Sequence, residues 1–242
     1  MLKRFLMGMF AAVAATSAAK ADFVIDTFIV PTPATTYTLG TANGSVYSSG
    51  AMALGGGLTR TITANQVGPV TLAATGFFGS SAIDGQAFQL NTSNSSIGSA
   101  TWALLNYSYA TPVNLAVGGP VLKFSFDALA TPTPFTVIVG DGTLTASQTG
   151  VVAVSTSSTT FELPLTGFGS VDLSMINSVQ IYVNRNTVTD FSQPDVDITL
   201  RDIRVSQSDT NPVIPAPPAV VLLLAAAPAL GLVRFARRKI AA

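Results

Sequence analysis

The sequence predicts an all-β protein: a single β-sandwich flanked by an N-terminal signal helix and a C-terminal transmembrane helix. Short apolar runs recur between turn-forming residues through the middle of the chain, as strands of a sandwich do. Residues that favour exposed helices are scarce, with one Glu (Glu162) and four Lys among 242 residues. Several runs also alternate between apolar and polar residues, which is typical of half-buried strands.

Residues 1–21 are interpreted as a secretory signal peptide. A positively charged start is followed by an apolar stretch of secretory length. Ala19 and Ala21 supply the small side chains that a signal peptidase accepts, so we expect cleavage after Ala21 to leave Asp22 first. Cleavage after Ala19 is the alternative. An uncleaved anchor fits less well, because the apolar run is short for a bilayer.

The predicted sandwich spans residues 22–207, and its strands are separated by turns rich in glycine. The clearest hairpin crosses Asp141-Gly142, a pair suited to a two-residue type I′ turn. The predicted strands are Phe23–Val30, Leu58–Thr63, Pro69–Ala73, Ala87–Leu90, Ala100–Tyr109, Val121–Asp127, Phe135–Val139, Val151–Val154, Thr160–Leu165, Val179–Val183 and Val196–Val205.

Alternation assigns an inner face to several of these strands. In the last strand the apolar set changes phase at Arg201-Asp202, and such a slip predicts a β-bulge. The residues predicted to face the core are Phe124, Phe126, Ile138, Ile181, Val183, Ile198 and Leu200.

Charge and composition exclude several functions. All twelve acidic residues lie between Asp22 and Asp209, where only five residues are basic, so this region has a net charge of −7. A surface of that sign repels phosphate backbones, so we expect no nucleic-acid partner. The chain has no Cys and no His, which removes thiol nucleophiles and the usual catalytic triad. Glu162 has no Asp at a spacing that recommends a glycosidase pair, and we expect no enzyme.

Two sets of residues are candidate binding sites. Flat aromatic rings with a polar tip suit stacking on sugars; the alternative is that these rings belong to the core. The candidate glycan contacts are Trp102, Tyr107, Tyr109 and Tyr182.

Carboxylates near the last strand are candidate ligands of a structural Ca²⁺, which prefers several oxygen ligands. The spacing matches no strict calcium loop, and the alternative is that Asp195 starts a strand while Asp197 faces solvent. No other cofactor is expected. The candidate set is Asp26, Asp195, Asp197 and Asp202.

The C-terminal end contains 22 uncharged residues, 212–233, followed by four cations. We divide it into a Pro-rich linker with a sorting motif (208–218), a transmembrane helix (219–233) and a basic cytoplasmic tail (234–242). The Pro-rich shoulder lengthens the apolar span to roughly bilayer thickness at ~1.5 Å per residue. A buried core helix would not end in such a cluster, whereas stop-transfer cations remain cytoplasmic. These cations are Arg234, Arg237, Arg238 and Lys239.

This order of Pro motif, apolar helix and Arg-rich end resembles the PEP-CTERM class of sorting tail. The motif here is Pro215, Ala216 and Pro217, with Ala216 where the name-giving motif has Glu. The resemblance covers residues 212–239. It implies recognition by an exosortase, an integral membrane protease or transpeptidase of Gram-negative bacteria that also make exopolysaccharide. The implied route is export, an inner-membrane intermediate, and then the cell surface or extracellular matrix.

The stretch 102–205 is also similar to the jelly-roll ectodomains found with such tails and to carbohydrate-binding modules. The segments that carry this resemblance are Leu122–Asp127, 134–142, 171–184 and 194–205. Together the two resemblances imply a surface or matrix protein associated with exopolysaccharide. The alternatives are a carbohydrate-binding module proper, or a single-pass membrane protein whose tail is never processed.

Overall fold

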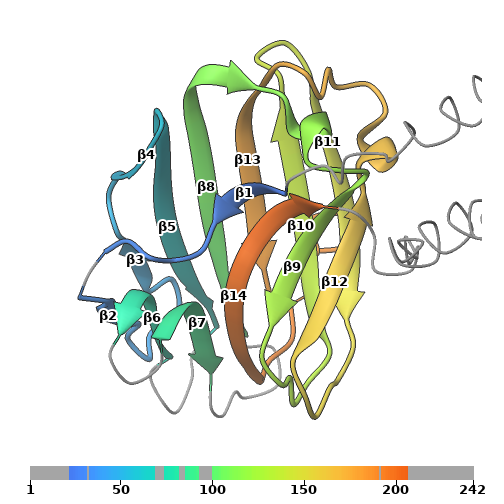
Figure 1. Ribbon diagram of the computed structural model, residues 1–242. Coiled ribbons are helices and arrows are strands. Elements are labelled where there is room, and N and C mark those ends of the chain that lie inside the picture. Colours follow the sequence, from blue (N-terminus) through green and yellow to red (C-terminus); the bar gives the residue numbers. More distant parts are fainter. Residues whose placement is uncertain are drawn as a thin grey trace, which may run out of the picture. The chain divides into compact units, whose positions relative to one another are not determined.

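Two antiparallel sheets pack face to face in the computed structural model, which describes residues 22–31, 33–68, 74–81, 85–92, 100–190 and 192–206 (Figure 1). Sheet A has the strand order β12-β9-β14-β7-β6-β2, with β1 also paired to β14. Sheet B has the order β11-β10-β13-β8-β5-β3, with β4 also paired to β5. The predicted β-sandwich is therefore confirmed.

The strands of sheet A are β1 (Phe23–Asp26), β2 (Thr35–Thr38), β6 (Thr75–Ser81), β7 (Gly85–Thr92), β9 (Val121–Phe126), β12 (Thr159–Pro164) and β14 (Val196–Ser206). Those of sheet B are β3 (Val46–Ser48), β4 (Met52–Gly55), β5 (Leu58–Val67), β8 (Ala100–Val113), β10 (Thr133–Gly140), β11 (Thr145–Val152) and β13 (Ile176–Val183). Two short 3₁₀ helices lie at Leu115–Val117 and Leu165–Phe168.

The core lies between the sheets and is built by alternating strands. Phe124 and Phe126 of β9 are buried, while the alternate residues Lys123 and Ser125 face outward. Their rings contact Phe135 of sheet B, with centroids 6.2 and 5.4 Å apart. All the described strands and core residues belong to one compact unit, so this region contains its own hydrophobic core.

Ile138 was predicted in the core, and that prediction is wrong. Val137 and Val139 of β10 are fully buried, and Ile138 between them faces outward. The run from Phe135 to Val139 is almost continuously apolar, so its sequence does not reveal which face is buried. The other predicted core residues are buried, namely Phe124, Phe126, Ile181, Val183, Ile198 and Leu200.

The predicted hairpin and bulge are both present. The hairpin joins β10 to β11, but its loop is Asp141–Leu144, four residues and not two. The Asp141 carboxylate causes this, because it accepts hydrogen bonds from the backbone N–H groups of Thr143 and Leu144 at 2.8 Å. In β14 the register with β9 shifts between Leu200 and Asp202, where the bulge was predicted.

Four strands were not predicted: β2, β3, β4 and β6. They are short or consist mainly of Thr, Ser, Gly and Tyr, so their apolar pattern is weak. The predicted first strand is also shorter, since β1 ends at Asp26. The predicted strand at 69–73 lies outside the described residues.

A buried ion pair joins the first strand to the opposite sheet. Arg60 of β5 is fully buried and is paired with Asp26 of β1. The Asp26 carboxylate also accepts hydrogen bonds from the Tyr107 hydroxyl at 2.9 Å and the Phe28 N–H at 2.7 Å. The Arg60 guanidinium lies over the Phe28 ring, 5.2 Å from its centroid. This cluster therefore connects β1 of sheet A to β5 of sheet B.

Candidate functional site

The outer face of sheet B presents an aromatic pair among uncharged polar side chains. On β8, Trp102, Leu104 and Asn106 point away from the core, because Ala103, Leu105 and Tyr107 point into it. The register places Tyr182 of β13 beside Leu104, and Gln180 beside Asn106. We call this surface the aromatic face, and its residues are Asn65, Trp102, Leu104, Asn106, Gln180 and Tyr182.

Charged residues are divided unequally between the two sheets. Among the described strands of sheet B, the one charged residue is Arg60, which is buried. Sheet A carries its charges mostly on the outer face, and they include Lys123, Glu162, Asp197, Arg201, Asp202 and Arg204. The described strands that carry the aromatic face therefore present no charged side chain on their outer side.

Two of the four predicted glycan contacts, Trp102 and Tyr182, are neighbours on this face. Their ring centroids are 5.7 Å apart with an interplanar angle of 43°, and both side chains are partly exposed. The Arg185 guanidinium carbon lies 4.3 Å from the Trp102 centroid and 5.9 Å from that of Tyr182. Such packing is a cation–π contact. The guanidinium thus extends the flat aromatic surface and adds hydrogen-bond donors to it.

A well-anchored loop holds Arg185 in this position. Asn184 is fully buried, and its Nδ2 donates to the carbonyl oxygens of Thr101 at 2.7 Å and Gln193 at 2.8 Å. The Thr136 hydroxyl donates to the Arg185 carbonyl at 3.1 Å. The guanidinium itself donates to Asp190 at 2.7 Å, and the Asp190 side chain is 78% exposed. The backbone of Arg185 is therefore fixed, while its ion pair is open to solvent.

The other two predicted glycan contacts lie in the core. Tyr107 is fully buried and Tyr109 is 9% exposed, and both point into the sandwich. Burial raises the pKa of both hydroxyls above the usual value for tyrosine, and the nearby Asp26 carboxylate raises it further. Neither ring can reach a ligand on the surface. Their direction follows from the register of β8, in which Trp102 faces outward.

The four aspartates predicted as Ca²⁺ ligands do not come together. Asp26 is buried with Arg60, whereas Asp195 and Asp197 are exposed. The Asp202 carboxylate accepts hydrogen bonds from Arg204 at 2.8 Å and from the Ser125 hydroxyl at 3.1 Å. Within the part of the chain that the structure describes, no three acidic residues form a group that could hold a metal ion.

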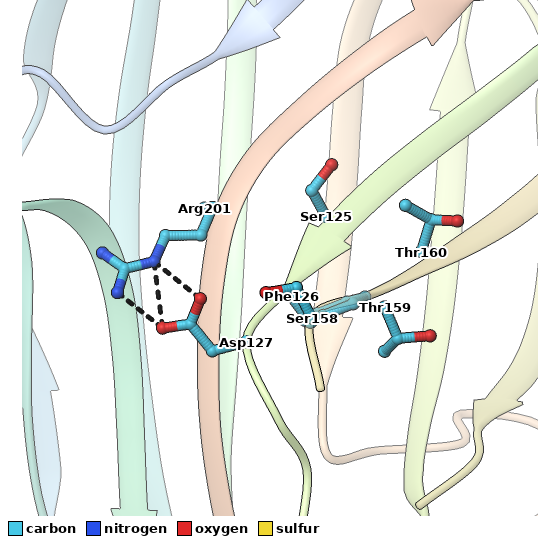
Figure 2. Close-up of a pocket in the computed structure, with 7 residues that line it drawn as sticks. All are labelled: Ser125, Phe126, Asp127, Ser158, Thr159, Thr160 and Arg201. Atoms are coloured by element: carbon cyan, nitrogen blue, oxygen red, sulfur yellow. Dashed lines mark hydrogen bonds and ion pairs between the residues drawn. The ribbon is translucent and has the colours of Figure 1, made fainter. Parts of the chain in front are cut away.

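A pocket of about 480 Å³ opens on the outer face of sheet A, where β9, β12 and β14 meet (Figure 2). The bulge in β14 leaves both Arg201 and Asp202 partly exposed on the outer side. Arg201 Nε donates to both Asp127 carboxylate oxygens at 3.0 Å. A second nitrogen of Arg201, Nη1, donates to the Gln86 carbonyl at 3.3 Å. The pocket is lined by Ser125, Phe126, Asp127, Ser158, Thr159, Thr160 and Arg201.

Sequence reasoning did not identify Arg185 or this pocket. Arg185 lies two residues after the end of β13, but nothing in the sequence places it against Trp102, 83 positions earlier. The predicted bulge did contain Arg201, and a bulge next to a polar loop is a signal for a re-aimed side chain. The partner of Arg201, Asp127, is 74 positions away and is brought close only by strand pairing.

Several predicted residues lie outside the described residues. They are the cleavage residues Ala19 and Ala21, the motif Pro215, Ala216 and Pro217, and the cations Arg234, Arg237, Arg238 and Lys239. In the described part of the chain, no helix has the length and apolar character needed to cross a bilayer, and the span predicted at 219–233 is not in that part.

No family model matches the chain, and no curated protein matches it. Among solved structures, it is similar to a family 11 carbohydrate-binding module from Clostridium thermocellum in complex with a β-1,3-1,4-mixed-linked tetrasaccharide. The identity is 11%, the match covers 79% of this chain and 98% of the module, and the TM-score is 0.36. An exo-β-agarase matches at 13% identity over 77% of this chain and 25% of its own, with a TM-score of 0.38. TmCBM61 in complex with β-1,4-galactotriose matches at 12% identity over 71% of this chain and 86% of its own, with a TM-score of 0.31. Such low identities and TM-scores assign no ligand to this chain.

Proposed function

We propose that this is an exported bacterial surface or matrix protein whose sandwich binds polysaccharide through the aromatic face. The observation that carries the proposal is the Trp102–Tyr182 pair on a sheet face without charged strand residues. Sugar rings present apolar C–H faces and polar rims, so they suit aromatic rings surrounded by amide and hydroxyl groups. Asn106 and Gln180, side by side in the register, supply such amides.

The charge distribution supports a neutral contact over an ionic one. The region between Asp22 and Asp209 has a net charge of −7, which disfavours simple ionic adhesion to an acidic polymer. The cation at the aromatic face, Arg185, is already paired with Asp190. Binding should therefore depend on stacking and hydrogen bonding, and it should survive added salt.

The delivery route is part of the same proposal and rests on the sequence. Cleavage after Ala21 would release the N-terminus, and an exosortase-type enzyme would process the tail at the motif Pro215, Ala216 and Pro217. The residues that stop transfer would be the four cations after Val233. A binding module left at the surface by this route fits association with exopolysaccharide.

The test is affinity electrophoresis of the 22–207 fragment through gels containing the exopolysaccharide of the producing organism. Wild type should be retarded equally at low and high salt. Trp102→Ala and Tyr182→Ala should each weaken binding by about 2- to 12-fold, the range expected for losing one aromatic contact. Val154→Ala is a control, because Val154 is exposed but does not belong to the aromatic face. Retardation that disappears in high salt, or that is undiminished in both aromatic variants, would refute the proposal.

A further inference from the structure

We propose that the pocket in Figure 2 is a second saccharide site, so that one domain holds two saccharide chains on opposite sheets. Its ligand class rests on the proposed function, but its residues are separate from the aromatic face. The pocket volume of about 480 Å³ lies within the ordinary range of small-ligand sites. The polar groups that line the pocket determine which ligand it can bind.

The pocket places an ion pair opposite a row of hydroxyl groups. Ser158 directly precedes β12, Thr159 and Thr160 begin it, and the register sets Thr160 beside Ser125 of β9. Within the described residues, the side-chain hydroxyls of Ser158, Thr159 and Thr160 form no hydrogen bond. Across the pocket, the side chains of Asp127 and Arg201 are 39% and 33% exposed. Ser158 and Thr160 are also exposed, so a ligand can reach these four side chains, whereas Thr159 is paired with the buried Phe126 and lies on the inner side of β12.

This set of groups matches adjacent hydroxyls of a neutral sugar. Each sugar hydroxyl donates one hydrogen bond and accepts others. The Asp127 carboxylate can accept from one hydroxyl while keeping its Arg201 contacts, because each oxygen has two lone pairs. The Ser and Thr hydroxyls can donate or accept as the neighbouring sugar hydroxyl requires. The ion pair has no net charge, so the site offers no excess attraction to an anion.

Two ligands can bind at once because the two sites lie on different sheets. The aromatic face is the outer surface of sheet B, and the pocket is on the outer surface of sheet A. The core separates them, so neither ligand obstructs the other. A domain with both sites would connect two polysaccharide chains without forming a dimer.

The fluorescence of the single tryptophan makes it possible to distinguish binding at the aromatic face from binding at the pocket. Trp102 is the only Trp in the chain and belongs to the aromatic face, so its fluorescence reports that site, while calorimetry reports both. The probes are neutral hexasaccharides of β-1,4-glucan, β-1,3-glucan, β-1,4-galactan and β-1,4-mannan, each titrated into the full-length protein in detergent. At least one probe should give two binding sites by calorimetry and a fluorescence change that accounts for one of them.

The variant Ser158→Ala/Thr160→Val removes two pocket hydroxyls. It should weaken the calorimetric second site by about 5- to 150-fold, as expected for two lost hydrogen bonds, and leave the fluorescence titration unchanged. The matched control is Thr156→Val/Ser157→Ala, which changes the same loop outside the pocket and should behave as wild type. Tyr182→Ala should have the opposite effect: it should lower the affinity measured by fluorescence at the aromatic face and leave the affinity of the pocket, measured by calorimetry, unchanged.

The remaining outcomes are also decisive. One calorimetric site with a normal fluorescence change would overturn the second site and leave the proposed function intact. If calorimetry detects binding without a fluorescence change, and the pocket variant abolishes that binding, the result would support the pocket site and refute binding at the aromatic face. An absence of heat and fluorescence change with every probe would overturn both. Tighter binding of a uronic-acid hexasaccharide at the pocket would overturn its assignment to neutral sugars.

Discussion

Replacing Arg60 with Met tests whether the buried ion pair fixes β1 in the sandwich. Arg60 is fully buried and the Asp26 side chain is 3% exposed. The variant leaves the Asp26 carboxylate with the Phe28 N–H and the Tyr107 hydroxyl but without its counter-charge. Removing one partner of a buried pair typically costs about 3–5 kcal/mol of unfolding free energy. Asp26→Asn should cost a similar amount, because it leaves the buried guanidinium without its counter-charge.

The double variant distinguishes an ion pair from two independent contacts. Arg60→Met/Asp26→Asn removes both charges together, so it should cost less than the sum of the single variants by about 2 kcal/mol or more. Unfolding free energies come from urea titrations of the 22–207 fragment followed by Trp102 fluorescence. Arg204→Met is the matched control, since Arg204 pairs with Asp22 and Asp202 at the surface; it should cost at most about 1 kcal/mol. Additive single effects, or an Arg60→Met cost below about 1 kcal/mol, would refute this reasoning.

Three further predictions concern the core, the tyrosines and the tail. Phe124→Ala should lower the unfolding free energy by about 3–5 kcal/mol in the same urea titration, because the ring is fully buried. Burial raises the pKa values of Tyr37, Tyr107 and Tyr109. In the unfolded chain these tyrosines have a pKa of about 10, and below that pH the unfolding free energy keeps the full contribution of their protonated hydroxyls. Above that pH, the unfolding free energy should fall by about 1.4 kcal/mol per pH unit for each tyrosine. Absorbance at 295 nm should then show these phenols ionising only as the chain unfolds, and early ionisation would contradict their burial. Replacing Pro215 and Pro217 with Leu should leave an unprocessed, membrane-retained precursor in immunoblots of fractionated cells, because the prolines keep the processing site out of the helix; equally efficient release would mean that the tail is only an anchor.

Alternation predicted which face is buried only where one side of a strand is polar. In β9 and β14 the outward residues are charged or polar, so the inner faces and the bulge at Arg201-Asp202 were predicted correctly. In β10 both faces are apolar, and Ile138 was placed inside by mistake. Strands that lack an apolar pattern, such as β2, were not found.

The same limitation explains the aromatic residues of β8. Each face of this strand carries apolar and aromatic side chains, with Trp102 and Leu104 on one and Leu105 and Tyr107 on the other. Sequence alone could not choose between them. The choice follows from long-range pairing, because Tyr107 reaches the Asp26 carboxylate, 81 positions earlier. That contact satisfies the buried hydroxyl and leaves Trp102 on the outside.

Both ends of the described chain lie in sheet A, so processing at either end would act away from the sheet that carries the aromatic face. Phe23 of β1 pairs with Val205 of β14, and Asp22 accepts a hydrogen bond from Arg204 at 3.1 Å. The first described residue and the last strand are therefore neighbours, although 182 positions separate Asp22 from Arg204. Cleavage before Asp22 and processing beyond Ser206 would both act next to this strand pair of sheet A. The aromatic face belongs to the other sheet, so neither event would need to alter the strands that carry Trp102 and Tyr182.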